Sequence, residues 1–227
     1  MMKNILLFMT VMLPFILISC GDDKDGPVVP DNHEYVDLGL PSGTLWATCN
    51  IGANSPEEYG DYFAWGETSP KEEYGWSNYK WCKWDPSLTL TKYNYNSESG
   101  KVDSKIELDP KDDAAYVNWG PSWRMPSKEQ QYELYKNCTS KWTTQKGVYG
   151  YLFTGPNGNT LFLPAAGRWY FSYGYDGMGA LYWSRTLFPQ SSTSSYMMTF
   201  SYWSTVELQY IERAGGVSVR AVRASKK

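Results

Sequence analysis

The sequence predicts an α+β domain of mixed short strands with two short helices and long loops. Short runs of apolar, aromatic and β-branched residues recur between Gly, Pro and Asn turn signals, as is typical of strands. One stretch carries the signals of a capped helix, and a shorter stretch before it predicts another. About 195 residues follow the N-terminal leader, a length that suits one domain.

The first 19 residues have the organisation of a cleaved export signal. Lys3 supplies the positive charge, and the largely apolar segment Ile5–Ile18 is short for a membrane span. Leu17-Ile18-Ser19-Cys20 resembles a lipobox, so we expect lipid attachment at Cys20; a plain secretory signal is the alternative. Residues 20–34 form an acidic, Pro-containing tether that resembles the surface-export signals of some Gram-negative lipoproteins. These features predict a lipid-anchored outer-membrane protein that faces the cell exterior.

The domain is expected to span residues 35–227, with strands flanking two turns. Pro41-Ser42-Gly43 is the first turn, and residues 155–159 form a hairpin turn. A polar region, residues 72–103, shows no clear period and predicts an extended loop, and residues 173–179 predict a Gly-rich aromatic loop. Strands are predicted at residues 35–40, 44–51, 148–154, 160–163, 181–185, 196–202, 205–211 and 217–223, and residues 61–66 are either strand or loop.

Both helices are predicted between residues 112 and 138. Residues 112–118 are consistent with a short helix. Trp119 and Trp123 then bracket a Gly-Pro-Ser turn that we expect to fill the core. Ser127 is a good N-cap, and Gln130 three residues later completes the signature of a capping box. A helix is therefore predicted to begin after Ser127.

Arg124 lies between Trp123 and Met125 in this stretch. A charge inside an apolar cluster has to be paired, because leaving it desolvated costs several kcal/mol. We therefore expect Arg124 to form a structural, buried ion pair whose loss lowers stability by several kcal/mol. A catalytic arginine is the alternative.

The composition and the types of reactive side chain exclude several classes of function. With a formal net charge of −3, the chain is a poor nucleic-acid binder. Its 11 Trp and 19 Tyr residues either fill a core or form a binding surface. His33 is the only histidine, and adjacent carboxylates such as Glu57-Glu58 fall where such pairs are usually solvated. The spaced glycines of residues 174–179 precede no helix and predict no phosphate loop. We expect no enzyme and no cofactor.

Three cysteines remain once Cys20 carries lipid, in a compartment where disulfides persist. An odd number allows at most one pair within the chain. We expect Cys49–Cys138, because Cys49 lies in a predicted core strand and Cys138 ends the capped helix. Three buried or free thiols, Cys82 included, are the alternative. Without paired Cys spacing or a nearby His, the sequence predicts no metal site.

Long motifs run in order through the domain: Tyr35–Ala53, Tyr59–Glu67, Asn118–Ser127, Leu161–Gly167, Tyr182–Thr186 and Ser218–Val222. Together they resemble the bacterial major paralogous domain family, abbreviated FISUMP. The resemblance implies a C-type-lectin-like fold, related to that of formylglycine-generating enzymes, in a secreted or surface lipoprotein. The Glu-Pro-Asn, Gln-Pro-Asp and Trp-Asn-Asp motifs of calcium-dependent lectins are absent, and so are the paired active-site cysteines of the enzymes. Neither calcium binding nor catalysis is therefore carried over.

The resemblance also implies a place for a ligand. In some proteins of this fold, the C-terminal strands and loops form the ligand site and carry residues diversified by a retroelement. The matching stretch lies between Trp183-Ser184 and Val219-Arg220 and is rich in Ser, Thr and Tyr, whereas the family's usual counterpart is richer in Asn and Gly. Such a mixture suits an adaptable binding surface, and diversification is a hypothesis. The candidate binding residues are Tyr202, Trp203, Ser204, Glu207, Gln209, Tyr210 and Glu212.

Strand alternation orients the candidates in residues 205–211. Val206, Leu208 and Tyr210 are predicted to face the core, and Glu207 and Gln209 to point outward with Ile211. Trp203 at the preceding turn is expected beside them as an exposed ring; a ring that merely covers the sheet edge is the alternative. The leading hypothesis is a non-catalytic domain that binds a glycan, peptide or protein. The rival is a structural component of a surface assembly or adhesin, in which the aromatic residues fill the core or form subunit contacts.

Overall fold

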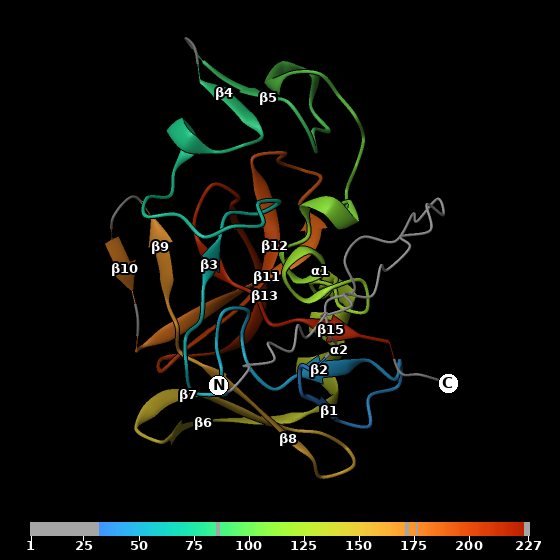
Figure 1. Cartoon of the computed structure of the whole chain (residues 1–227), viewed down its shortest axis with the longest axis vertical. Helices are drawn as coiled ribbons and strands as arrows, with labels where there is room; N and C mark the ends of the chain where they lie inside the picture. The colour runs from blue at the N-terminus through green and yellow to red at the C-terminus, as the bar shows by residue number, and fades with distance from the viewer. Residues whose placement is uncertain (1–31, 85–86, 171–172, 176, 225–227) are drawn as a thin grey trace, which may run out of the picture.

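A computed structural model describes residues 32–84, 87–170, 173–175 and 177–224 (Figure 1). Within these ranges it contains two α-helices, α1 (Ala114–Trp119) and α2 (Lys128–Asn137), and many short strands. The predicted α+β class is confirmed at this level. The predicted signal segment, Cys20 and the part of the predicted tether before residue 32 lie outside the described residues. No described helix has the length and apolar character needed to cross a bilayer.

The largest sheet has five strands in the order β13-β12-β11-β14-β3. Neighbouring strands run antiparallel except β14, which is parallel to β11. The chain therefore places β13 at one edge of this sheet. The strands are β3 (Tyr62–Phe63), β11 (Gly179–Leu187), β12 (Ser194–Ser201), β13 (Ser204–Glu212) and β14 (Val217–Ser218).

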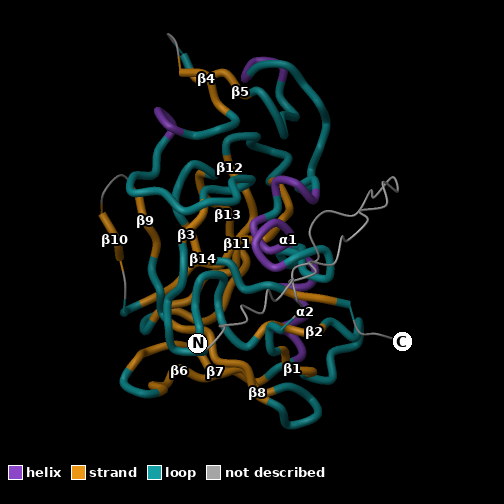
Figure 2. Tube along the Cα trace, viewed as in Figure 1, coloured by secondary structure: helices purple, strands orange, loops and turns teal. Residues whose placement is uncertain are grey.

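Smaller sheets surround the large one (Figure 2). A three-stranded sheet joins the two ends of the domain in the order β1-β2-β15, and another runs β6-β7-β8. Two further pairs are β4–β5 and β9–β10. The strands are β1 (Tyr35–Asp37), β2 (Leu45–Ala47), β4 (Cys82–Trp84), β5 (Leu88–Leu90), β6 (Thr139–Gln145), β7 (Val148–Thr154), β8 (Thr160–Pro164), β9 (Arg168–Tyr170), β10 (Tyr173–Tyr175) and β15 (Val222–Arg223).

Several strand predictions are corrected by this arrangement. Residues 72–103, predicted as an extended loop, contain β4 and β5 together with short 3-10 turns. Residues 173–179 begin with β10 instead of a loop. The predicted strand 217–223 is divided between two sheets, because Val219 and Ala221 accept hydrogen bonds from the backbone of Ile51 and Ala47. β6 was not predicted at all.

α2 begins as predicted, whereas α1 begins at Ala114, two residues after the predicted start at residue 112. The Ser127 hydroxyl accepts from the Gln130 amide at 3.2 Å, and the Gln130 side chain accepts from the Ser127 amide at 2.9 Å, which completes the capping box. Asp113 caps α1 by accepting from the amides of Ala115 and Tyr116. α2 packs against β11, β12 and β13. The capping box therefore sets where the helix that covers this face of the large sheet begins.

Two apolar clusters form most of the core. We call the first the tryptophan cluster; it includes Trp65, Trp119, Trp123 and Trp183. The second, the α2-side cluster, includes Leu134, Phe153, Tyr182 and Phe200. Trp123 is fully buried, so the loop between α1 and α2 fills the core as predicted.

Arg124 is paired, but the buried member of the pair is its partner. Arg124 Nε lies 2.8 Å from Asp113 Oδ2, and Nη2 donates to the Leu108 carbonyl. The Arg124 side chain is 32% exposed, whereas that of Asp113 is 0% exposed. The prediction of a structural ion pair is confirmed, and the prediction that Arg124 itself is buried is wrong. Trp123 and Met125 on either side of it are buried, while the Arg124 side chain reaches toward water.

Two other arginines are fully buried, and the sequence did not single them out. Arg220 donates to the carbonyls of Ala47, Thr48 and Phe162 and to the Asn50 side chain. Arg213 donates to backbone carbonyls and packs over aromatic rings. Burial lowers the pKa of both guanidinium groups. Carbonyl dipoles replace much of the lost water in both places.

The predicted disulfide between Cys49 and Cys138 is wrong, since both cysteines and Cys82 are free thiols. Cys49 packs against the tryptophan cluster, and Cys138 belongs to the α2-side cluster. The two residues therefore lie in different parts of the core. Burial raises the pKa of Cys138 to about 11, which suppresses the reactive thiolate.

Candidate functional site

The edge strand β13 carries most of the candidate binding residues. Glu207 lies opposite Thr199 on β12, and Gln209 lies opposite Met197. Both candidates are exposed, while Val206 and Leu208 pack on the α2-side cluster. The predicted alternation is therefore confirmed over these four residues.

The alternation prediction fails at the end of the strand. Tyr210, predicted to face the core, is 52% exposed and stacks on Phe188 with ring centroids 3.8 Å apart. Ile211, predicted to point outward, packs against the tryptophan cluster. Tyr210 lies opposite Tyr196, whose ring is covered by Lys128 at the start of α2. At this end of the sheet α2 begins, and the Phe188 ring covers Tyr210 instead.

The turn between β12 and β13 presents its rings to solvent. Trp203 is 75% exposed, as the sequence predicts, and Tyr202 is 59% exposed. The Trp203 amide donates to Ser201 Oγ at 3.2 Å, and the hydroxyls of Ser201 and Ser204 lie 2.8 Å apart. These bonds fix the turn and hold the Trp203 ring clear of the sheet edge.

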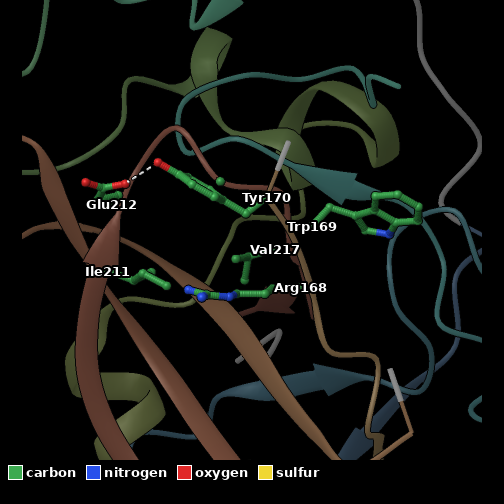
Figure 3. Close-up of a pocket in the computed structure, with 7 residues that line it drawn as sticks. Arg168, Trp169, Tyr170, Ile211, Glu212 and Val217 are labelled. Atoms are coloured by element: carbon green, nitrogen blue, oxygen red, sulfur yellow. Dashed lines mark hydrogen bonds between the residues drawn. The ribbon is translucent and has the colours of Figure 1, made fainter. Parts of the chain in front are cut away.

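Two cavities lie along the large sheet and share Arg168. One, of about 250 Å³, is lined by Arg168, Tyr170, Ile211 and Glu212 among others (Figure 3). The other, of about 240 Å³, is lined by Arg168, Leu181, Thr199 and Trp203 among others. We call the two together the groove. It brings side chains of β9 to Trp203, just before β13, and to Ile211 and Glu212 at the end of that strand.

The first cavity holds a fixed carboxylate and a cation. Tyr170 donates to Glu212 Oε2 at 2.7 Å, and burial together with that carboxylate raises the pKa of Tyr170 to about 12. Figure 3 shows the Arg168 guanidinium ending beside Ile211, with Trp169 pointing away. Across the described ranges, no side chain or carbonyl accepts a hydrogen bond from that guanidinium. Its donors are therefore available to a ligand in the groove.

The structure places two of the seven candidates in the groove. Trp203 lines the second cavity and Glu212 the first. Glu207 and Gln209 lie between them on β13 and share a hydrogen bond of 3.0 Å. Glu207 and Gln209 line neither cavity, so only Trp203 and Glu212 belong to the lining of the groove.

The other three candidates, Tyr202, Ser204 and Tyr210, also line neither cavity. Tyr202 contacts the Trp142 ring on β6, with ring centroids 6.0 Å apart. The Ser204 hydroxyl is held within its turn, and Tyr210 covers Phe188. Arg168 and Tyr170 replace them in the groove. Sequence reasoning missed both, although the alternation in Arg168-Trp169-Tyr170 was a signal for the strand that places them.

The groove is equipped for recognition. An exposed indole offers area to an apolar or ring surface, Arg168 offers donors, and Glu212 offers an acceptor. Among the residues that the structure describes, no group of three His, Cys, Asp or Glu side chains is placed to hold a metal ion.

The chain matches no protein-family model, no curated protein and no solved structure.

Proposed function

We propose that this protein is a lipid-anchored domain on the outer surface of a bacterium that binds a glycan, peptide or protein without chemically changing it. The groove is the observation that carries the proposal. It joins the exposed Trp203, the Arg168 guanidinium and the Glu212 carboxylate along one sheet edge. Sites with apolar walls and a few directed polar groups are typical of ligand binding.

The chemistry of the groove favours a ligand with both a flat apolar face and polar groups. Trp203 contributes a rigid ring with little entropy to lose on binding. Arg168 donates to carboxylates, carbonyls or hydroxyls, and Glu212 accepts from hydroxyls or amides. Sugars and aromatic peptide side chains carry both kinds of surface.

The proposal includes a C-type-lectin-like fold of the FISUMP type. Its support is the order of the motifs from Tyr35–Ala53 to Ser218–Val222, together with the observed α+β class. Retroelement diversification of the C-terminal strands belongs to the same hypothesis. A reverse-transcriptase gene beside an imperfect copy of the C-terminal coding stretch would support it; neighbouring genes without either would count against it.

Changing Trp203, Glu207 and Gln209 together to alanine is expected to remove ligand binding. Arrays of glycans and proteins would first identify a ligand for the wild-type protein. Because the three side chains are exposed, the variant should melt within a few degrees of wild type, while its affinity falls at least about 30-fold. Titration calorimetry measures the affinity, and thermal unfolding measures the stability.

Tyr132→Ala is the matched control, because Tyr132 is 49% exposed on α2 and lies outside the groove. Its affinity should equal that of wild type. A triple variant that keeps its affinity, or one that no longer folds, would show that the groove is wrongly assigned.

Replacing Cys20 by serine is expected to prevent lipid attachment. Serine has no thiol to accept the lipid, so the protein should remain uncleaved or become soluble. Membrane fractionation and the mass of the N-terminal peptide measure the outcome. Normal maturation and continued membrane anchoring of the Cys20→Ser protein would contradict lipidation at this residue.

A structural role in a surface assembly is the second candidate function. Trp142 on β6 stacks with Tyr149, whose side chain is 47% exposed, and contacts Tyr202. Such an exposed aromatic surface suits a contact between subunits. Light scattering of the purified protein distinguishes the two functions. A monodisperse monomer that binds a ligand disfavours assembly, and a defined oligomer without a ligand favours it.

A further inference from the structure

A second cleft is lined by residues of α2, β11, β15 and neighbouring loops. Figure 1 shows α2 and β15 on the opposite side of the molecule from β9 and β10. It has a volume of about 460 Å³, larger than either cavity of the groove. Its walls include three arginines, Arg124, Arg185 and Arg223. We call it the arginine cleft.

Backbone pairing brings the three arginines together from distant parts of the chain. Arg124 and Val222 exchange backbone hydrogen bonds of 2.9 and 2.8 Å, which places the loop before α2 beside β15. The Arg185 amide donates to the Pro126 carbonyl at 2.8 Å, which places β11 beside the same loop. The cluster of charges is thus fixed by the fold.

Two of the guanidinium groups keep unused donors. Arg124 is held through Nε and Nη2, and Arg185 is held through Nε by Glu107 and through Nη1 by the Met125 carbonyl. Within the described part of the chain, Arg124 Nη1 and Arg185 Nη2 have no acceptor, and neither atom is among the buried, unsatisfied ones. Both atoms are therefore open to solvent.

Arg223 is held in a fixed orientation. Its guanidinium carbon lies 5.0 Å from the centre of the Tyr35 ring and 5.2 Å from that of Trp123. None of the described residues that line the cleft is acidic; Asp113 and Glu107 hold their arginines from outside it, and Glu133 accepts from Ser42 at its margin. The lining is therefore cationic, and guanidinium groups match the geometry of oxyanions.

We propose that the arginine cleft binds an oxyanion carried on a sugar, such as the carboxylate of a uronic acid or a sulfate ester. The cleft has the volume of a site for a whole small molecule, which exceeds the space that a lone oxyanion fills. Ser42 and Ser122 add exposed hydroxyl groups to its wall. Such groups suit the hydroxyls next to the anionic group of a sugar.

Ser122 offers a test that leaves the arginines untouched. It lines the cleft, and its side chain is exposed, so substitutions there should not disturb the fold. Ser122→Asp places a carboxylate among the arginines, while Ser122→Asn adds similar bulk without charge. The full chain would be titrated with oligogalacturonate and with a sulfated disaccharide at constant ionic strength. A neutral maltooligosaccharide, sodium sulfate and polyglutamate serve as comparison probes.

We expect both acidic saccharides to bind the wild-type protein and Ser122→Asn alike, and to bind Ser122→Asp at least about tenfold more weakly. The Trp203, Glu207 and Gln209 triple-alanine variant should bind them like wild type, because it alters only the groove. Equal binding by the two Ser122 variants, or no binding by wild type, would overturn the proposal. Sulfate or polyglutamate that binds as tightly as the saccharides would overturn the assignment to a sugar.

Discussion

Replacing Asp113 by alanine is expected to lower the free energy of unfolding by about 3 to 5 kcal/mol. The carboxylate is fully buried and accepts from the amides of Ala115, Tyr116 and Met125 as well as from Arg124 Nε. Alanine would remove the cap of α1 and leave buried donors without acceptors. Urea denaturation of the wild type and the variant measures the loss.

Two further variants separate the parts of this loss. Asp113→Asn keeps an oxygen for the cap but loses the charge, so we expect a smaller loss. Arg124→Ala is expected to cost about 1 to 2 kcal/mol, because Asp113 keeps its backbone donors and Arg124 is partly exposed. This value replaces the larger one that the sequence suggested for Arg124. An Arg124→Ala loss as large as that of Asp113→Ala would contradict the assignment.

Replacing Arg220 by lysine is expected to cost about 3 kcal/mol or more, although the charge is kept. The guanidinium donates to the carbonyls of Ala47, Thr48 and Phe162 and to Asn50, and a single ammonium nitrogen cannot reach all of them. Buried acceptors would be left unsatisfied. The measurement is again the free energy of unfolding in urea.

Arg168→Lys is the matched control for this substitution. Arg168 lines the groove, and in the described structure its guanidinium has no acceptor, so its stability change should stay within about 0.5 kcal/mol. Wild-type stability of the Arg220→Lys protein would show that the carbonyl contacts contribute little.

The sequence predicts best those elements whose signals are local. The capping box of α2 needs only Ser127 and Gln130, and the β7–β8 hairpin needs only the turn at residues 155–159. In both cases the interacting groups are a few residues apart. The local sequence therefore nearly suffices to determine the backbone conformation of these elements.

Other elements depend on partners that are far away in the chain. β6 is mostly polar and partly exposed, so it lacks the apolar alternation that predicts a strand, and it is held by pairing with β7. Arg220 is buried because carbonyls from residues 47, 48 and 162 converge on it. Cysteine counting likewise could not show that Cys49 and Cys138 belong to different clusters.

Only part of the groove could be predicted from the sequence, for the same reason. Alternation oriented Glu207 and Gln209 correctly because α2 covers the opposite face of β13 there. The same rule misplaced Tyr210, because the packing changes at the end of the strand. Arg168 enters the groove from β9, a strand that the sequence did not reveal.

The sheet β1-β2-β15 brings the first and last strands of the domain close together, on the two sides of β2. Asp37 and Arg223 lie opposite the same residue, Leu45, from its two sides. Two strand spacings separate them, about 10 Å, a gap that about three or four extended residues would bridge. Ends that lie close together are what allow a domain to be inserted into a loop of another protein. The fold is therefore suited to insertion between two segments of a larger polypeptide.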